Sequence, residues 1–345
     1  NHISRRRFLK QLAGGLALCG VGVLASACAS VVEDTTATEE TPTETTTQPP
    51  TEESATPVEK DGAASYVLPT EDGAWAPAAA HIGDRPSGRG TVAIRDMETI
   101  VFDAGQVETV RPEIFQPGHF SLFDALVHVA ERGDIDLDYH YDERADTHVI
   151  DAINGQGGWK YTAYYSNGWP EPNAFRMDMY PYKNDTIFTL EPGNDSRLQA
   201  IHQTFRDEVE RLKRNDGQVI IPNLTIRSPK EDWAFQDVAV TAHDVRRDVL
   251  QPGVVTALDA LISLREQGKL PTLKLTWYER IGRADPVDSY WVEQVDDASA
   301  TGGCGFVYET GPKAYAGFSG SHIYIPADVR VTVSPEYALW FWICL

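Results

Sequence analysis

The sequence predicts an α+β protein in which one unit, a mixed β-sheet with a single helix, occurs twice around a central amphipathic helix. Three observations lead to this fold class: an internal repeat, a helix with the same start and end signals in each copy, and strands of alternating polarity after each helix. A chain of 345 residues, 42% of them hydrophobic, is longer than most single domains and can fill two ordinary cores.

The internal repeat joins two segments that align with only small insertions. They are QPGHFSLFDALVHVAERGDIDLDYHYDERAD, which begins at Gln116, and QPGVVTALDALISLREQGKLPTLKLTWYERIGRAD, which begins at Gln251. Each segment opens on Gln-Pro-Gly, continues through Asp-Ala-Leu, and passes a glycine into an alternating run that ends in Glu-Arg. A match of this length indicates a duplicated structural unit.

Each copy carries the signals of one capped helix. Ser121 and Thr256 are typical N-cap residues, and an aspartate follows each of them three positions later, as in a capping box. Gly133 and Gly268 follow the last apolar position, where a left-handed residue ends a helix. We expect each helix to lay one apolar stripe on a sheet.

The run DIDLDYHY after the first helix resembles the start of a calcium-binding loop. Asp134, Asp136 and Asp138 have the spacing of an EF-hand, but that loop also needs glycine at its sixth position and glutamate at its twelfth. Those positions hold Tyr139 and Ala145. The second copy has no acids there and keeps the alternation, so both runs predict a strand with one solvent-exposed face.

Each copy is expected to end in a further strand after a glycine-rich and aromatic stretch. These last strands are predicted at residues 185–192, DTIFTLEP, and at residues 328–335, DVRVTVSP. Between the copies, residues 195–218 predict a connecting helix, because their apolar residues recur at helical spacing and Gly217 closes the run. The apolar stripe consists of Leu198, Ile201, Phe205, Val209 and Leu212.

Residues 1–28 look like a twin-arginine signal peptide. Arg5 and Arg6 precede a glycine-rich apolar run that falls short of the roughly 20 residues of a membrane span. LASAC resembles a lipobox, which makes Cys28 the expected lipidation site; Leu24 lies one position too far out, so ordinary cleavage to a soluble product stays open. Residues 29–64, rich in Thr, Glu and Pro, predict a disordered tether. The expected location is the extracytoplasmic face of the cell membrane, through a lipid anchor.

The repeated unit is similar to the β-grasp domain at the carboxyl end of transcobalamin and intrinsic factor, and to a broad bacterial domain family. SLFDAL and INGQGGWKY carry this resemblance, which covers residues 91–192 well and residues 232–345 less well. It implies two tandem β-grasp-like domains, residues 65–194 and 219–345. It also implies ligand binding outside the cell, with cobalamin the ligand of the animal relatives, in which a separate helical barrel completes the corrinoid site.

Several function classes find no support in the sequence. A net charge of −21 without a basic stripe after the first ten residues disfavours nucleic acid. The nine histidines show no metal-ligand spacing, and GFSGSH does not match the nucleophile elbow of hydrolases. We therefore expect no catalytic residues, no metal and no resident cofactor.

The stretch AINGQGGWKYTAYYSNGW, residues 152–169, predicts a β-hairpin that turns at Asn-Gly. Most of its rings should pack inward, but strict alternation cannot bury all of them, so some form a ligand platform. The candidate ligand-binding residues are Trp159, Tyr161, Tyr165, Asn167 and Trp169. In the second copy, Cys304 and Cys344 form either a disulfide or two buried thiols, and the sequence leaves both open.

The function predicted from these observations is ligand binding without catalysis. The protein is expected to capture a small molecule at the membrane surface for uptake, and a corrinoid is one candidate. The alternative is an adhesive module that binds another envelope protein through sheet edges and aromatic side chains.

Overall fold

The structure is a computed structural model that describes residues 63–67, 84–165, 171–173, 176–193, 195–278, 288–313 and 325–344. These residues belong to one compact unit, Val58–Leu345. The fold is α+β, as expected: its strands form several small sheets, and the described ranges contain three α-helices. None of these helices is long and apolar enough to cross a membrane. The signal peptide, Cys28 and most of the tether lie outside the described residues.

The first repeat, residues 89–192, places a mixed sheet, one helix and a separate β-hairpin in sequence. Its elements are β2 (Arg89–Ile94), β3 (Ile100–Asp103), η1 (Ala104–Gln106), α2 (Leu122–Glu131), β4 (Leu137–Asp142), β5 (Thr147–Ile153), β6 (Trp159–Tyr165), β7 (Glu171–Asn173), η2 (Met177–Met179) and β8 (Thr186–Pro192). The sheet order is β3-β2-β8-β6-β7, in which only β2 and β8 are parallel. The strands β4 and β5 form a sheet of their own.

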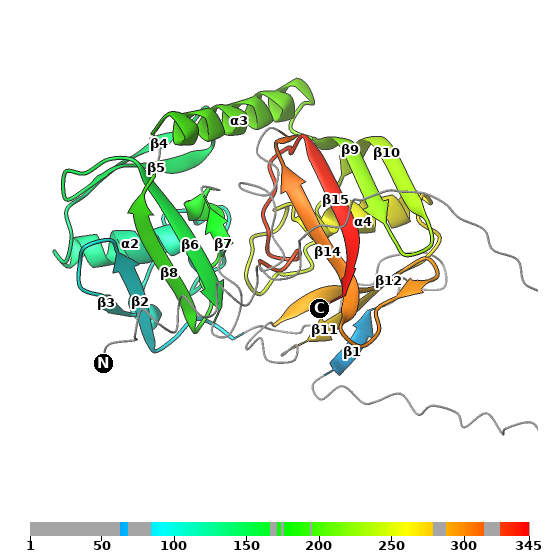
Figure 1. The fold of residues 1–345 in the computed structure, drawn as a ribbon, viewed down its shortest axis with the longest axis horizontal. Coiled ribbons are helices and arrows are strands. Elements are labelled where there is room, and N and C mark those ends of the chain that lie inside the picture. Colours follow the sequence, from blue (N-terminus) through cyan, green and yellow to red (C-terminus); the bar gives the residue numbers. More distant parts are fainter. Residues whose placement is uncertain are drawn as a thin grey trace, which may run out of the picture. The chain divides into compact units, whose positions relative to one another are not determined.

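The second repeat, residues 219–344, has the same strand order. Its elements are β9 (Val219–Arg227), β10 (Asp232–Val240), α4 (Ala257–Glu266), β11 (Leu273–Tyr278), β12 (Ser289–Val295), β13 (Ala298–Ser299), β14 (Cys304–Gly311) and β15 (Tyr337–Cys344). The sheet order β10-β9-β15-β14 repeats β3-β2-β8-β6, with β9 and β15 as the parallel pair (Figure 1). The internal duplication seen in the sequence is therefore also a duplication of topology.

The hairpin β4–β5 of the first repeat and the hairpin β11–β12 of the second repeat have the same strand register. In the first, Leu137 lies opposite Ile153, and a β-bulge interrupts the register after Asp138. In the second, Leu273 lies opposite Val295, and the bulge follows Lys274. Because a bulge is a local feature that bends and twists a strand, its presence at the same position makes β4 and β11 equivalent strands.

Both predicted helices are confirmed, together with their caps. Ser121 and Thr256 each form a capping box with the aspartate three residues later. The glycines beyond the helix ends have φ angles of 82° at Gly133 and 68° at Gly268, the left-handed region that the C-terminal motif requires. The run DIDLDYHY contributes the strand β4, as predicted, but the predicted alternation between a buried and an exposed face is not observed, because Asp138, Tyr139, His140 and Tyr141 are all exposed.

The connecting helix is α3, Asp195–Arg214 (Figure 1). Its apolar stripe is buried at Ile201, Phe205 and Val209, which are 0%, 1% and 6% exposed. Arg206 forms an ion pair with Asp142 of β4 at 2.7 Å, and the guanidinium of Arg211 donates a hydrogen bond to the carbonyl of Ser334. The helix therefore contacts both repeats and is more than a spacer.

A strand that the sequence analysis did not expect precedes the first repeat. This strand, β1 (Ala63–Val67), begins inside the predicted tether and adds antiparallel to the free side of β11 (Figure 1). The predicted first domain, which began at residue 65, thus contributes its first residues to a sheet of the second repeat.

The last strand of the second repeat was predicted in the wrong place. Residues 328–335 form turns and bends, and only Val331 makes an isolated bridge, to Thr256; the strand is β15, Tyr337–Cys344. The physical reason is Asp328, which is fully buried. Its carboxylate accepts hydrogen bonds from the Ser289 hydroxyl and the Tyr290 amide at the start of β12. These bonds hold the segment around Asp328 against the hairpin β11–β12.

The two Gln-Pro-Gly segments pair with each other. Phe115 and Leu250, which occupy equivalent positions, form an antiparallel bridge. The amide of Gln116 donates to the carbonyl of Val249 at 2.9 Å, and the amide of Gln251 donates to the carbonyl of Ile114 at 2.8 Å. Equivalent backbone groups therefore bond reciprocally, so the contact has local two-fold symmetry.

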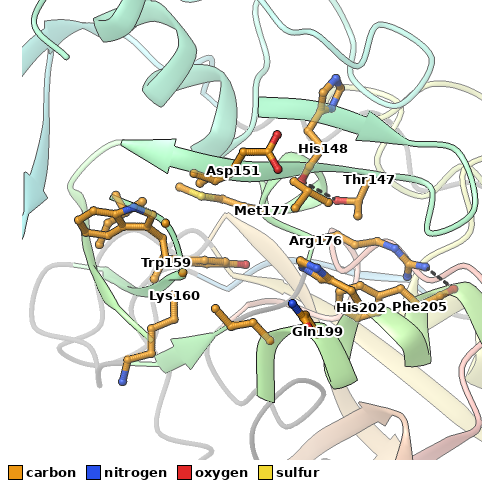
Figure 2. Close-up of a pocket in the computed structure, with 17 residues that line it drawn as sticks. Thr147, His148, Asp151, Trp159, Lys160, Arg176, Met177, Gln199, His202 and Phe205 are labelled. Atoms are coloured by element: carbon orange, nitrogen blue, oxygen red, sulfur yellow. Dashed lines mark hydrogen bonds between the residues drawn. The ribbon is translucent and has the colours of Figure 1, made fainter. Parts of the chain in front are cut away.

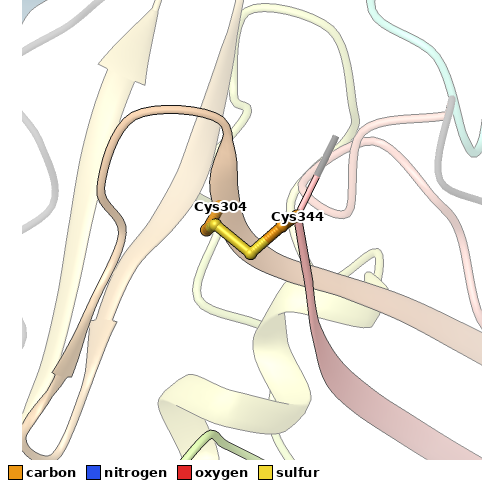
Figure 3. Close-up of a disulfide and its surroundings, with 2 residues drawn as sticks. All are labelled: Cys304 and Cys344. Carbon is orange, nitrogen blue, oxygen red and sulfur yellow. A yellow bond between two sulfur atoms is a disulfide. The ribbon is translucent and has the colours of Figure 1, made fainter.

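Of the two alternatives for the cysteines, the structure contains the disulfide (Figure 3). Cys304 begins β14 and lies directly opposite Cys344 at the end of β15. Trp159 and Pro192 hold the equivalent positions opposite each other in β6 and β8. The disulfide thus joins β14 to β15 at the position where Trp159 of β6 lies opposite Pro192 of β8 in the first repeat.

Removing the disulfide should destabilise the second repeat without altering its topology. With 40 residues between the cysteines, loop closure is worth about 4 kcal/mol of unfolding free energy in the chain-entropy account. We expect the Cys304→Ser, Cys344→Ser double variant to lose free energy of unfolding on this scale in urea denaturation. Reductant should destabilise the parent chain and leave the double variant unchanged; equal stability of parent and variant without reductant would contradict the prediction.

Candidate functional site

The candidate site is a pocket of about 300 Å³ in the first repeat. It lies between β5, the start of β6, the segment at η2 and the first half of α3 (Figure 2). Its labelled lining residues are Thr147, His148, Asp151, Trp159, Lys160, Arg176, Met177, Gln199, His202 and Phe205. No strand pairs with β5 on its pocket side among the described residues, so side chains of α3 close the space between β5 and β6.

Two of the predicted ligand-binding residues line this pocket. Trp159 is half-buried, packs against the core, and donates its ring N–H to the carbonyl of Gln156. Tyr161 is only 4% exposed and forms an edge contact with Tyr180, so it belongs to the floor and not to an exposed platform. The side chain of Tyr165, and the whole of Asn167 and Trp169, lie outside the described residues.

Arg176 forms a charged wall of the pocket, and its side chain is almost fully buried among the protein's own groups. Its guanidinium forms an ion pair with Glu208 at 2.9 Å and donates to the carbonyls of Ala145 and Phe205. It also lies over the Phe205 ring, 4.5 Å from the centroid. Since its side chain is buried and its polar contacts join η2, the β4–β5 turn and α3, Arg176 fixes the position of the helix over the pocket.

His202 is the polar group most available to a ligand. Its ring centroid lies 5.9 Å from that of Phe205 in a tilted arrangement, and the imidazole makes no hydrogen bond within the described part of the chain. Burial lowers its pKa, and the charge of Arg206 lowers it further, although Asp142 acts in the opposite direction. At neutral pH the imidazole is therefore uncharged and offers one donor and one acceptor.

The charges at the rim are paired. Lys160 and Arg95 both contact the carboxylate of Glu191, the first at 2.9 Å, and these hydrogen bonds lower the pKa of Glu191. Asp151 pairs with His140 at 2.7 Å. Because the charged groups at the rim have hydrogen-bond partners of their own and His202 is neutral, the pocket is suited to an uncharged ligand with hydrogen-bonding groups and one flat apolar face.

A buried ion pair that the sequence analysis missed holds β5 in place. Arg111 contacts Asp178 at 2.6 Å, and Asp178 also accepts hydrogen bonds from the Thr147 hydroxyl and the His148 amide. His148 also directs its imidazole to Asp178, stacks on Phe123 and points away from the pocket in Figure 2.

The second repeat contains the same arrangement. Arg246 contacts Asp328 at 3.1 Å, and Asp328 accepts from the Ser289 hydroxyl and from the Tyr290 amide at 2.9 Å. A signal for this pair existed in the sequence, because an arginine stands five residues before Gln-Pro-Gly in both copies. Arg111 and Arg246 lie just before the two repeated segments, which begin at Gln116 and Gln251.

The pocket is a property of the first repeat alone among the described residues. The corresponding region of the second repeat holds a cavity of only about 20 Å³. Trp342 replaces Leu190 opposite the ring of Phe306, and the disulfide replaces Trp159. The small cavity is lined by rings that include Trp291, Phe306, Tyr308 and Trp340, whereas Trp342 lines a separate hollow of about 490 Å³ beside Arg227 and Leu339.

No group of three His, Cys, Asp or Glu side chains that could hold a metal ion occurs in the part of the chain that the structure describes. The carboxylates of Asp151 and Glu191 at the rim are paired with other side chains. The arrangement offers an aromatic surface, a neutral imidazole and the amide of Gln199, which are groups for binding.

Loss of the buried carboxylate should weaken the fold, and most strongly above acidic pH. Burial alone raises the pKa of Asp178, but the hydrogen bond from His148 and the charge of Arg111 outweigh it and lower the pKa. Its contribution is therefore complete above the unfolded value of about 3.9 and is lost as the pH falls through the folded value. We expect Asp178→Asn to lose about 3–5 kcal/mol of unfolding free energy at pH 7. As the pH falls, the unfolding free energy of the variant should decrease less steeply than that of the parent. Urea denaturation from pH 7 to pH 3 measures both effects, and Asp138→Asn, at an exposed aspartate, is the control. A decrease of the unfolding free energy with pH that is as steep in Asp178→Asn as in the parent would contradict this prediction.

The titration of His202 tests the electrostatics of the pocket directly. We expect its NMR titration to give a pKa below that of a free histidine, about 6.5. Arg206→Gln should raise this pKa, because it removes a positive charge and leaves the carboxylate of Asp142 nearby. An unchanged or lower pKa in the variant would contradict the assignment.

Comparisons with protein families, curated proteins and solved structures found no match to this chain. The resemblance to the transcobalamin β-grasp domain therefore remains an expectation from the sequence.

Proposed function

We propose that this protein is a surface-anchored lipoprotein that captures a small ligand without transforming it. The observation that carries the proposal is the open pocket of the first repeat, which has an aromatic floor and unpaired hydrogen-bonding groups, while its counterpart is filled. A duplicated scaffold that keeps a pocket in one copy and only a small cavity in the other is consistent with one binding repeat and one supporting repeat.

The proposed family assignment is a tandem pair of β-grasp-like domains. It is supported by the strand order, in which a hairpin, a helix and a second hairpin precede a last strand parallel to the first. The proposed anchor is a diacylated Cys28 after twin-arginine export, and its support is the sequence LASAC. The tether would then place the pocket outside the membrane surface, where it could deliver its ligand to a transporter.

The dimensions of the pocket bear on the ligand. A volume of about 300 Å³ lies at the lower end of the range of small-molecule sites. A corrinoid is much larger than this volume, so cobalamin could place only one edge in the pocket and would need a further surface. We therefore propose first an uncharged ligand the size of a sugar or nucleoside, and a corrinoid second.

Isothermal titration calorimetry with mono- and disaccharides, nucleosides, heme and cyanocobalamin tests this function. Calorimetry is preferred to fluorescence for the variants, because Trp159→Ala removes the fluorophore nearest to the ligand. We expect saturable binding of one ligand class, a loss of about tenfold or more in affinity in Trp159→Ala, and partial recovery in Trp159→Phe. Trp233→Ala is the matched control, since Trp233 is also half-buried but belongs to β10 of the second repeat.

Two results would overturn the proposal. One is the absence of binding for every class at high micromolar ligand. The other is binding that Trp159→Ala and Trp233→Ala weaken equally, because that would place the ligand outside the pocket.

A further inference from the structure

The two repeats differ at one strand edge. In the second repeat, β1 runs antiparallel along the outer side of β11, with Tyr66 opposite Thr276 and Val67 opposite Leu275. The equivalent strand of the first repeat, β4, pairs with β5 only, and no described strand lies on its outer side. Since β4 and β11 share their register and their bulge, the same kind of edge is occupied in one repeat and open in the other.

Side-chain exposure differs accordingly at the equivalent positions. Tyr139 is 40% exposed and Tyr141 is 43% exposed, and these are two of the three large hydrophobic side chains that are exposed among the described residues. Their counterparts in β11 are Leu275 and Trp277, which are 0% and 2% exposed. An unpaired edge that also exposes two aromatic rings is uncommon, because such edges invite association.

We propose that β4 is a docking edge for an extended segment of another protein, which would add to it as β1 adds to β11. Backbone hydrogen bonds to the free side of β4 would supply register, and the segment would cover the rings of Tyr139 and Tyr141. This surface is distinct from the pocket, which lies on the other side of β5, and the inference does not depend on the ligand proposed there.

The charges at this edge indicate a basic partner. Asp136 and Asp138 are exposed, and their carboxylates form no ion pair with any residue that the structure describes. A second copy of this chain is a poor occupant, because it would bring the same acids against the edge and carries a net charge of −21. The second copy's β1 already has a partner edge within its own chain, at high effective concentration. The partner we infer is an extended peptide with small or aromatic residues on one face and Lys or Arg on the other.

A fluorescein-labelled peptide based on β1, Ala-Ala-Lys-Tyr-Lys, places both Lys on the strand face opposite the tyrosine and is the probe; the same peptide with Glu in place of both Lys is its control. Fluorescence anisotropy with the full chain measures affinity, and hydrogen exchange locates the site. We expect the Lys peptide to bind, the Glu peptide to bind at least about tenfold more weakly, and the amides of residues 137–142 to gain protection.

Matched variants assign the binding to the edge. Asp138→Lys places a lysine where β11 carries Lys274, so the strand tolerates the residue, and we expect the affinity for the Lys peptide to fall about tenfold or more. Glu231→Lys makes the same change of charge in the turn after β9 and should leave the affinity unchanged. Trp159→Ala should also leave it unchanged, which separates this edge from the pocket.

The remaining outcomes overturn the proposal. These are no binding of the Lys peptide at high micromolar concentration, equal loss in Asp138→Lys and Glu231→Lys, or protection confined to residues 273–278, where the peptide would have displaced β1. A dimer of the chain that protects residues 137–142 without peptide would assign the edge to a second copy instead.

Discussion

A buried arginine–aspartate pair is the interaction on which each repeat depends. Arg111 and Asp178 in the first repeat, and Arg246 and Asp328 in the second, join the segment before the helix to the segment before the last strand. The same aspartate accepts hydrogen bonds from the first residues of the hairpin's second strand, which is β5 in the first repeat and β12 in the second. Because removal of one partner would leave a buried charge unpaired, the geometry of the hairpin is strongly constrained.

The constrained hairpin has two sides, and both have functional consequences. Its inner strand in the first repeat, β5, forms one wall of the pocket, while its outer strand, β4, carries the free edge. In the second repeat the equivalent wall faces the rings of Phe306, Tyr308 and Trp340, and the equivalent edge carries β1. The same fold therefore occurs twice in this chain, once with a pocket and a free strand edge among the described residues and once with a small cavity and a paired edge.

The repeats are joined by contacts that differ in symmetry. The Gln-Pro-Gly segments pair reciprocally, whereas α3 interacts differently with each repeat. Over the first repeat, Arg176 and Phe205 bring the helix against the pocket, and toward the second the guanidinium of Arg211 reaches Ser334. A single helix cannot serve two equivalent surfaces in the same way, so its position breaks the symmetry and closes a pocket in one repeat only.

Local spacing and capping chemistry are enough to predict the duplication, both capped helices, the connecting helix and the strand character of DIDLDYHY. The position of the last strand of the second repeat depends instead on tertiary contacts, since Asp328 accepts hydrogen bonds from residues 38 and 39 positions earlier in the chain. Tertiary contacts also place Tyr161 in the floor of the pocket and Trp159 in its wall, with His202 of α3 facing them. They pair β1 with the edge of β11, while no described strand pairs with the outer edge of β4. Each of these depends on contacts between distant segments, whose pairing leaves no periodic signal in the chain.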